Sequence, residues 1–162
     1  RALIEKALSG ALDELTAMRA REGAALRRDI ALRLSTLETM TQAVEARNPE
    51  TVREYEDRLR TRIEELIGDE VDEQRLLQEV AIMADRSAVA EETVRLFSHI
   101  AQIRETMALP DPIGRKLDFL TQELNREINT IGSKAQDAGI AVIVVDIKSE
   151  LEKIREQIQN ME

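Results

Sequence analysis

The sequence predicts an all-α protein, and three observations lead to this prediction. Of the 162 residues, 43% are hydrophobic and only 2% are aromatic, which favours long helices with narrow apolar seams over strands rich in Val, Thr, Tyr and Phe. Apolar residues recur at three- and four-residue steps along most of the chain. Proline occurs only at Pro49, Pro110 and Pro112, so proline interrupts the helical pattern at two places.

The sequence of the N-terminal part, residues 1–67, predicts a long antiparallel helical hairpin. Residues 1–47 carry a helical apolar pattern without proline, which corresponds to a helix of roughly 70 Å. Asn48 suits a helix cap and Pro49 suits the first position of a new helix, so a turn is predicted here. The second helix of the hairpin covers 50–67, and Gly68 ends it.

Four further helices are predicted after the hairpin. Their expected ranges are about 73–84, 88–107, 113–137 and 140–162. The third of them follows a loop that its two preceding prolines impose. The chain is thus expected to contain a coiled-coil connector over 1–69 and a compact helical C-terminal domain over 70–162.

The last helix carries an unbroken heptad pattern. Its apolar residues are Ile140, Val144, Ile147, Leu151, Ile154, Ile158 and Met161. Such a seam requires a partner helix, so we expect the chain to self-associate through 140–161 into a homo-oligomer. The β-branched run 142–145 is interpreted as helix because the heptad phase continues through it.

Composition limits the compartment and the partners. The longest apolar run, 140–147, is interrupted by Asp146 and is too short to cross a membrane. There is no cysteine and no visible signal peptide, so a cytoplasmic location is predicted. The net charge of −9 argues against a generic nucleic-acid binder. It still permits an RNA-processing enzyme, because local cations or metal ions can hold phosphates.

The segment 114–134 carries the densest group of charged and amide side chains. Glu123 and Glu127 are one helical turn apart, so their carboxylates share a face. One interpretation is a divalent metal site that activates water for phosphodiester hydrolysis. The other is a structural ion-pair network with Arg126.

The single histidine, His99, belongs to a polar stripe beside an apolar face. Glu92, Arg95 and Gln102 complete this stripe at helical spacing. His99 is therefore either a metal ligand or general acid–base beside a carboxylate, or a boundary histidine in a salt-bridged stripe.

Cations near these groups are candidate contacts to RNA phosphates. They are Arg95, Arg115, Lys116, Arg126 and Lys134. Four of them lie on the predicted helix 113–137. The alternative is that these four cations simply form the solvent-exposed face of that helix.

Three stretches resemble the YicC-like bacterial stress-induced proteins, which are described as endoribonucleases. They are GRKLDFLTQELNREINTIGSK at 114–134, EVAIMADRSAVAEETVRLFSHI at 79–100 and SELEKIREQIQNME at 149–162. The resemblance is strong over 70–162 and loose over 1–69. It implies the C-terminal portion of an RNA-cleaving enzyme that carries a further N-terminal domain.

The resemblance and the residue pattern together define the expected site. The catalytic candidates are His99, Glu123 and Glu127, and the candidate ligands of Mn²⁺ or Mg²⁺ are Glu92, His99, Glu123 and Glu127. The expected function is metal-dependent RNA cleavage. The alternative is a non-catalytic coiled-coil scaffold, which does not require these side chains to converge.

Overall fold

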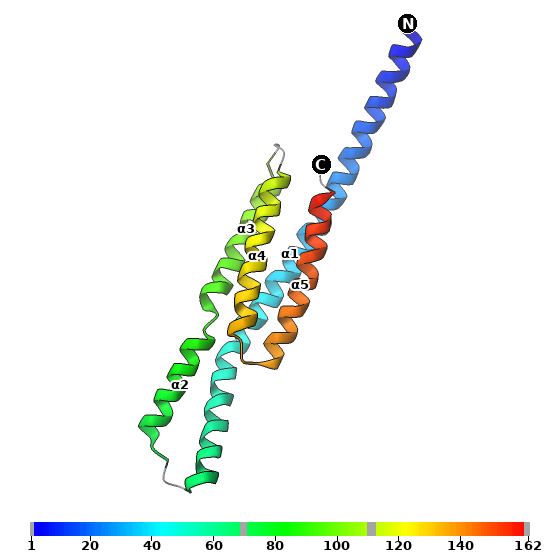
Figure 1. Ribbon diagram of the computed structural model, residues 1–162. Coiled ribbons are helices and arrows are strands. Elements are labelled where there is room, and N and C mark those ends of the chain that lie inside the picture. The colour runs from blue at the N-terminus through cyan, green and yellow to red at the C-terminus, as the bar shows by residue number, and fades with distance from the viewer. Residues whose placement is uncertain (1, 69–70, 110–112, 161–162) are drawn as a thin grey trace.

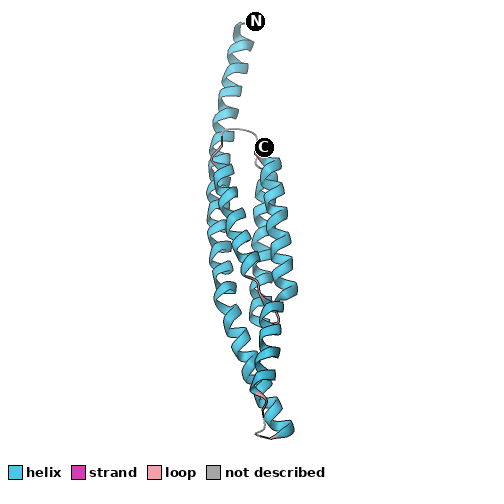
Figure 2. Ribbon diagram, turned by 90° about the vertical axis from the view of Figure 1, so that its left-hand side faces the viewer, coloured by secondary structure: helices cyan, strands magenta, loops and turns pink. Residues whose placement is uncertain are grey.

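The computed structural model describes residues 2–68, 71–109 and 113–160, and five α-helices account for most of them (Figure 1). The helices are α1 (Ala2–Ile67), α2 (Glu73–Ser87), α3 (Ala90–Met107), α4 (Gly114–Lys134) and α5 (Ala138–Gln159). No strand occurs in the described ranges, as Figure 2 shows, so the all-α prediction is confirmed. The loop predicted at Pro110 and Pro112 lies outside them.

The predicted hairpin between 1–47 and 50–67 is wrong, because α1 runs through Pro49 as one helix of 66 residues. The ring of Pro49 lies on the exposed side of the helix. On the opposite side, Val44 and Thr51 are both almost fully buried. The buried stripe therefore continues past the proline, and tertiary packing holds both halves of the helix in one line.

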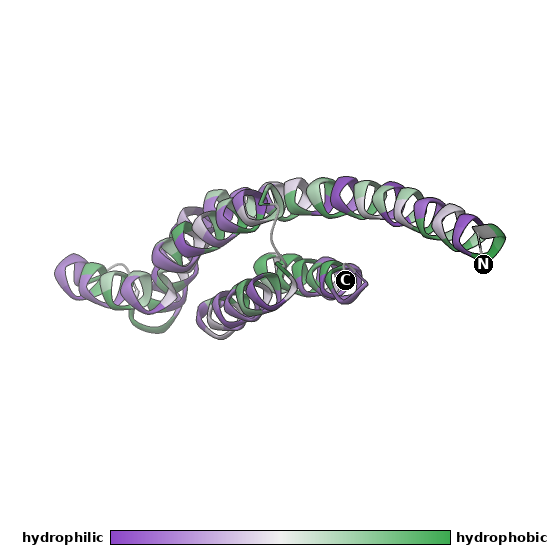
Figure 3. Ribbon diagram, turned by 90° about the horizontal axis from the view of Figure 1, so that it is seen from above, coloured by the Kyte–Doolittle hydropathy of each residue, from purple (hydrophilic) through white to green (hydrophobic). Residues whose placement is uncertain are grey.

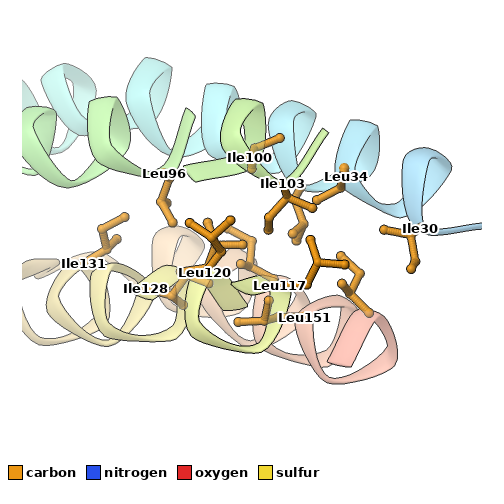
Figure 4. Close-up of a cluster of buried hydrophobic side chains, with 14 of the residues drawn as sticks. Ile30, Leu34, Leu96, Ile100, Ile103, Leu117, Leu120, Ile128, Ile131 and Leu151 are labelled. Carbon is orange, nitrogen blue, oxygen red and sulfur yellow. The ribbon is translucent and has the colours of Figure 1, made fainter. Parts of the chain in front are cut away.

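The middle of α1 forms a four-helix bundle with α3, α4 and α5. Each of these helices packs against two others: α1 and α4 both contact α3 and α5. Buried aliphatic side chains from all four helices point into one interior (Figure 4). Those labelled there are Ile30, Leu34, Leu96, Ile100, Ile103, Leu117, Leu120, Ile128, Ile131 and Leu151. Part of the predicted connector thus shares its core with the predicted C-terminal domain.

The heptad seam of α5 is covered by the same chain. Its apolar positions from Ile140 to Ile158 are buried, none more than 5% exposed, and α5 packs against α1 and α4. Met161 lies outside the described residues. The prediction that this seam closes against another chain is therefore wrong, because the bundle itself supplies the partner helices. Self-association would have to use a different surface.

The first third of α1 projects beyond the other helices (Figures 1 and 3). Its large apolar side chains are between 45% and 83% exposed. They are Leu3, Ile4, Leu8, Leu12, Leu15 and Met18. We call these six residues the α1 stripe. No described residue covers it, although an isolated helix of this length is only marginally stable in water.

The far end of α1 pairs with α2 in a narrow arm below the bundle (Figure 1). Gly68 follows the last residue of α1 with a φ of 78°, a left-handed conformation that glycine adopts at little cost. Asp72 caps α2 by accepting a hydrogen bond of 3.2 Å from the Arg75 amide. No helix in the described part of the chain has the length and apolarity of a membrane span.

A half-buried acid, Asp137, joins α1 to the start of α5. Asp137 caps α5 by accepting from the Ile140 amide at 2.8 Å, and Arg47 donates to it at 2.9 Å. The hydrogen bond from Arg47, followed by that from Ile140, lowers the pKa of the Asp137 carboxyl below its ordinary value. Its stabilising effect is therefore present above the unfolded-state pKa of about 3.9 and is lost as pH falls through the lower folded-state pKa.

Replacing Asp137 by Ala is expected to lower the free energy of unfolding by about 1 kcal/mol at neutral pH, the usual effect of losing a helix cap. The difference from wild type should shrink below about pH 4, where Asp137 begins to take up a proton in the unfolded wild-type chain. Urea unfolding at pH 7 and pH 3 measures both values. Asp137→Asn keeps a hydrogen-bond acceptor without the charge, so its free energy of unfolding at pH 7 should lie between those of wild type and Asp137→Ala. A difference that does not change with pH would contradict this assignment.

Candidate functional site

Most of the predicted site residues lie where α3 and α4 pack against each other. Two ion pairs between the helices fix their antiparallel register: Lys134 Nζ lies 2.7 Å from Glu92 Oε1, and Arg95 Nε lies 2.9 Å from Glu127 Oε2. We call the surface formed by these four residues and His99 the α3–α4 polar surface. It joins the first half of α3 to the second half of α4.

Glu92 is the most deeply buried charged group of this surface. It stands in the first turn of α3 and is 2% exposed. Burial raises the pKa of its carboxyl, but the hydrogen bond from Lys134, its backbone contact and the charges of Lys134 and Arg95 lower that pKa below the ordinary value. Glu92 is therefore ionised at neutral pH. Its Oε2 is buried and finds no hydrogen-bond partner among the described residues.

Arg95 occupies the centre of the surface. Besides Glu127, its guanidinium contacts Glu91 at 2.6 Å and Glu92 at 3.6 Å. The contact with Glu127 is the main cause that raises the pKa of Arg95 above its ordinary value. One cation thus lies among three carboxylates, two from its own helix and one from α4. This arrangement offsets the repulsion that would otherwise separate the acids.

His99 lies one turn beyond Arg95 and is partly buried. Its Nδ1 is enclosed, and nothing in the described ranges forms a hydrogen bond with it. The antiparallel register places His99 level with the Glu123–Glu127 turn of α4. The Glu123 carboxylate, however, is held at 2.9 Å by Arg126 on the same helix. A buried ring nitrogen without a partner among the described residues is uncommon, and such an atom is available to a bound water, a ligand or a transferred proton.

The carboxylates present here suit Mn²⁺ or Mg²⁺, which both prefer oxygen ligands, and of these two ions Mn²⁺ is the one that also accepts imidazole nitrogen. The arrangement of these side chains does not form a metal site. Glu92, Glu123 and Glu127 each hold a cationic side chain instead. Within the residues that the structure describes, no three acidic or histidine side chains gather closely enough to bind a metal ion. The residues as placed therefore do not fit the predicted metal.

The predicted RNA contacts fall into two groups. Arg95 and Lys134 are engaged by the acids of the α3–α4 polar surface. Arg115 and Lys116 lie exposed at the start of α4, and Arg126 is exposed near its middle. About 29 Å of helix separates the first and last of these cations on α4. They form a row along α4, not one cluster.

Sequence reasoning missed two participants. Glu91 pairs with Arg95, and its spacing of four residues was a usable signal. The main-chain carbonyl of Ala88 accepts a hydrogen bond of 3.2 Å from Lys134. No sequence signal could reveal this contact, because it joins backbone and side chain across 46 residues.

The fold and the surface together define a class of protein: an all-α bundle in which two antiparallel helices share a partly buried set of acids, cations and one histidine. The pattern of the family described as "Endoribonuclease YicC-like, C-terminal" matches residues 44–162. The chain belongs to this YicC-like family, as its sequence resemblance indicates.

Two curated relatives extend the comparison. The chain is 50% identical over 162 residues to "Probable endoribonuclease YicC" of Clostridioides difficile (strain 630), a match that covers 99% of this chain and 55% of that protein. It is 40% identical over 151 residues to the protein of the same name in Haemophilus influenzae (strain ATCC 51907 / DSM 11121 / KW20 / Rd), covering 93% of this chain and 52% of that relative. The chain spans about half the length of both relatives.

Proposed function

We propose that this chain is the C-terminal part of an endoribonuclease and that the α3–α4 polar surface takes part in cleaving RNA phosphodiester bonds. One observation carries the proposal: the buried, ionised Glu92 leaves Oε2 without a partner, and on the same helix face His99 leaves Nδ1 without one. Structural ion-pair networks normally satisfy such atoms. Membership of the YicC-like family supports the reaction class.

The proposed reaction is hydrolysis. A water oxygen attacks phosphorus, the bond from phosphorus to the ester oxygen breaks, a base accepts the proton of the water, and the departing oxygen receives a proton. His99 is suited to one of these proton transfers because an imidazole can both accept and donate a proton. Glu127 and Glu123 lie level with it on α4. Exposed Arg115, Lys116 and Arg126 would hold the RNA backbone along the same helix.

Dependence on Mn²⁺ or Mg²⁺ is a separate part of the proposal. It is supported by the donor types of Glu92, His99, Glu123 and Glu127, but not by their present arrangement. When bound, such an ion would neutralise charge on the phosphate and lower the pKa of a bound water. An RNA-cleavage assay with either metal, and with a chelator, tests this part independently of the residues.

Replacing Glu123 or Glu127 by Gln is expected to lower the cleavage rate at least about tenfold, because a carboxylate close to the reacting atoms loses its charge. Gln keeps the size of the side chain, so helical content should change little, while Glu127→Gln also loses the ion pair with Arg95 and should lower the unfolding midpoint slightly. Glu152→Gln, an exposed change on α5, is the matched control and should keep the wild-type rate. Wild-type cleavage in both α4 variants, with unchanged metal dependence, would refute the assignment.

The assay should include the full-length Clostridioides difficile relative beside this chain. If the relative cleaves RNA and this chain does not, the part of the relative that this chain does not match is required for cleavage. Cleavage by neither protein, under any metal condition, would refute the proposed function.

A non-catalytic coiled-coil scaffold is the second candidate, and the exposed α1 stripe favours it. A stripe of this length would be covered if the projecting helices of several chains associated as a homo-oligomer. Light scattering at increasing concentration, run beside the RNA assay, separates the candidates. Association without cleavage in any of the proteins would support the scaffold.

A further inference from the structure

Lys134 makes two contacts at the start of α3. It is the last residue of α4, and its ammonium lies 2.7 Å from Glu92 Oε1 and 3.2 Å from the carbonyl oxygen of Ala88. The side chain is about one-third exposed, whereas that of Glu92 is almost fully enclosed. One ammonium group therefore joins the end of α4 both to the connection between α2 and α3 and to the first turn of α3.

Ala88 lies in a break in the helical backbone, and Glu92 follows the break in the first turn of α3. α2 ends at Ser87, Ala88 is extended with φ −60° and ψ 121°, and α3 begins at Ala90. The first turn of α3 has no side-chain cap, because the residue before it is Val89. Apolar packing of buried Val89 holds the break from inside. On the polar side, Lys134 is the group that fixes it.

The break sets where α2 leaves the bundle, while the end of α1 in the arm continues directly from the bundle (Figure 1). The break also determines where the first turn of α3, and hence Glu92, lies. A displacement of the break would move the Glu92 carboxylate and the neighbouring Arg95 together, since both stand in the first two turns of α3. The Lys134 contacts therefore couple the arm to the α3–α4 polar surface.

We propose that Lys134 is a positioning residue: it fixes the break between α2 and α3 and the buried Glu92 carboxylate to the end of α4, and it does not bind phosphate. The part of this inference that concerns RNA cleavage rests on the proposed function. To bind a phosphate, Lys134 would have to leave Glu92 ionised, buried and without its nearest cation. Removal of one partner from a buried ion pair is strongly unfavourable.

Steady-state cleavage of a labelled single-stranded RNA by the full chain tests the role of Lys134. Lys134→Met keeps the apolar stem and removes the charge, and it is expected to lower kcat about tenfold with KM within about twofold of wild type. Lys134→Arg should restore most of kcat, because it again supplies a cation to Glu92. Lys148→Met, an exposed change on α5, should match wild type.

RNA binding as a function of salt separates positioning from a phosphate contact. The double variant Arg115→Ala with Lys116→Ala should make the slope of log K against log salt less negative by about 0.7 for each lost single-strand contact. Lys134→Met should keep the wild-type slope. A less negative slope together with a raised KM would show that Lys134 binds phosphate and would overturn the proposal.

Hydrogen exchange tests the structural link even if the chain cleaves no RNA. The Thr93 amide, which donates at 3.0 Å to the Val89 carbonyl in the first hydrogen bond of α3 after the break, should exchange at least about fivefold faster in Lys134→Met than in wild type or Lys134→Arg, because the start of α3 opens locally. Amides in the middle of α5 should keep their wild-type rates. Equal exchange of Thr93 in all variants would sink the proposal. Absence of cleavage in wild type would count only against the proposed function.

Discussion

Replacing both Leu151 and Ile154 by Asp is expected to unfold the bundle. These side chains are 4% and 0% exposed in the core that α5 shares with α1 and α4. Each change loses about 1.5–3 kcal/mol of apolar burial and places a carboxylate where burial costs several kcal/mol more. The sum approaches or exceeds the usual stability of a domain, about 5–15 kcal/mol. Circular dichroism should show loss of the cooperative thermal transition.

The matched control lies on the same helix. Val142 and Val145 have the same spacing but are 62% and 64% exposed, so replacing both by Asp should leave the chain folded with nearly the wild-type melting temperature. Both double variants introduce two Asp residues three positions apart, one pair on the buried face of α5 and the other on its exposed face. A Leu151/Ile154 variant that melts cooperatively, at a smaller mass than wild type in light scattering, would contradict the four-helix bundle and restore an intermolecular seam.

Replacing Pro49 by Ala is expected to stabilise the chain by about 2 kcal/mol. A proline inside a helix removes one backbone hydrogen bond and crowds the preceding turn, at a cost of about 3 kcal/mol. Part of the gain, about 0.4–1 kcal/mol, is lost because alanine gives the unfolded chain more freedom. Pro49 lies on the exposed side of α1, so alanine disturbs no core contact. The shift of the urea midpoint measures the change.

Asn48→Ala supplies the opposing test. If the chain turned at this point, Asn48 would cap the second helix, and its loss would cost about 1 kcal/mol. In the continuous helix α1, alanine is the better helix former, so the substitution should be neutral or slightly stabilising. Destabilisation by both Pro49→Ala and Asn48→Ala would mean that the helix breaks at these residues.

In the candidate site, residue spacing predicted which side chains share a helix face but not which side chains pair across helices. The spacing of Glu92, Arg95 and His99 correctly placed them on one stripe of α3, and that of Glu123 and Glu127 placed them on one face of α4. Spacing could not assign partners. Arg95 pairs with Glu127 and Lys134 with Glu92, and these contacts depend on the axial register of two helices, which side-chain packing sets.

The burial of Glu92 was equally hidden from the sequence. A glutamate in the first turn of a helix normally faces solvent and favours the positive end of the helix dipole. Here α4 covers it, and Lys134 keeps it ionised in the interior. Local sequence shows which residues lie near one another on a helix, but it cannot show how much water the neighbouring helix excludes.

The sequence by itself determined that the chain is all-α, where most of its helices lie and to which family it belongs. These properties follow from periodicity and motif identity, which are local. Only the tertiary structure decided that α1 continues through Pro49 and that the α5 seam is buried within the chain. A single proline destabilises a helix by less free energy than tertiary packing on both sides of it contributes. An apolar seam specifies that it must be covered, but not by which helix, because burial of apolar surface is non-directional.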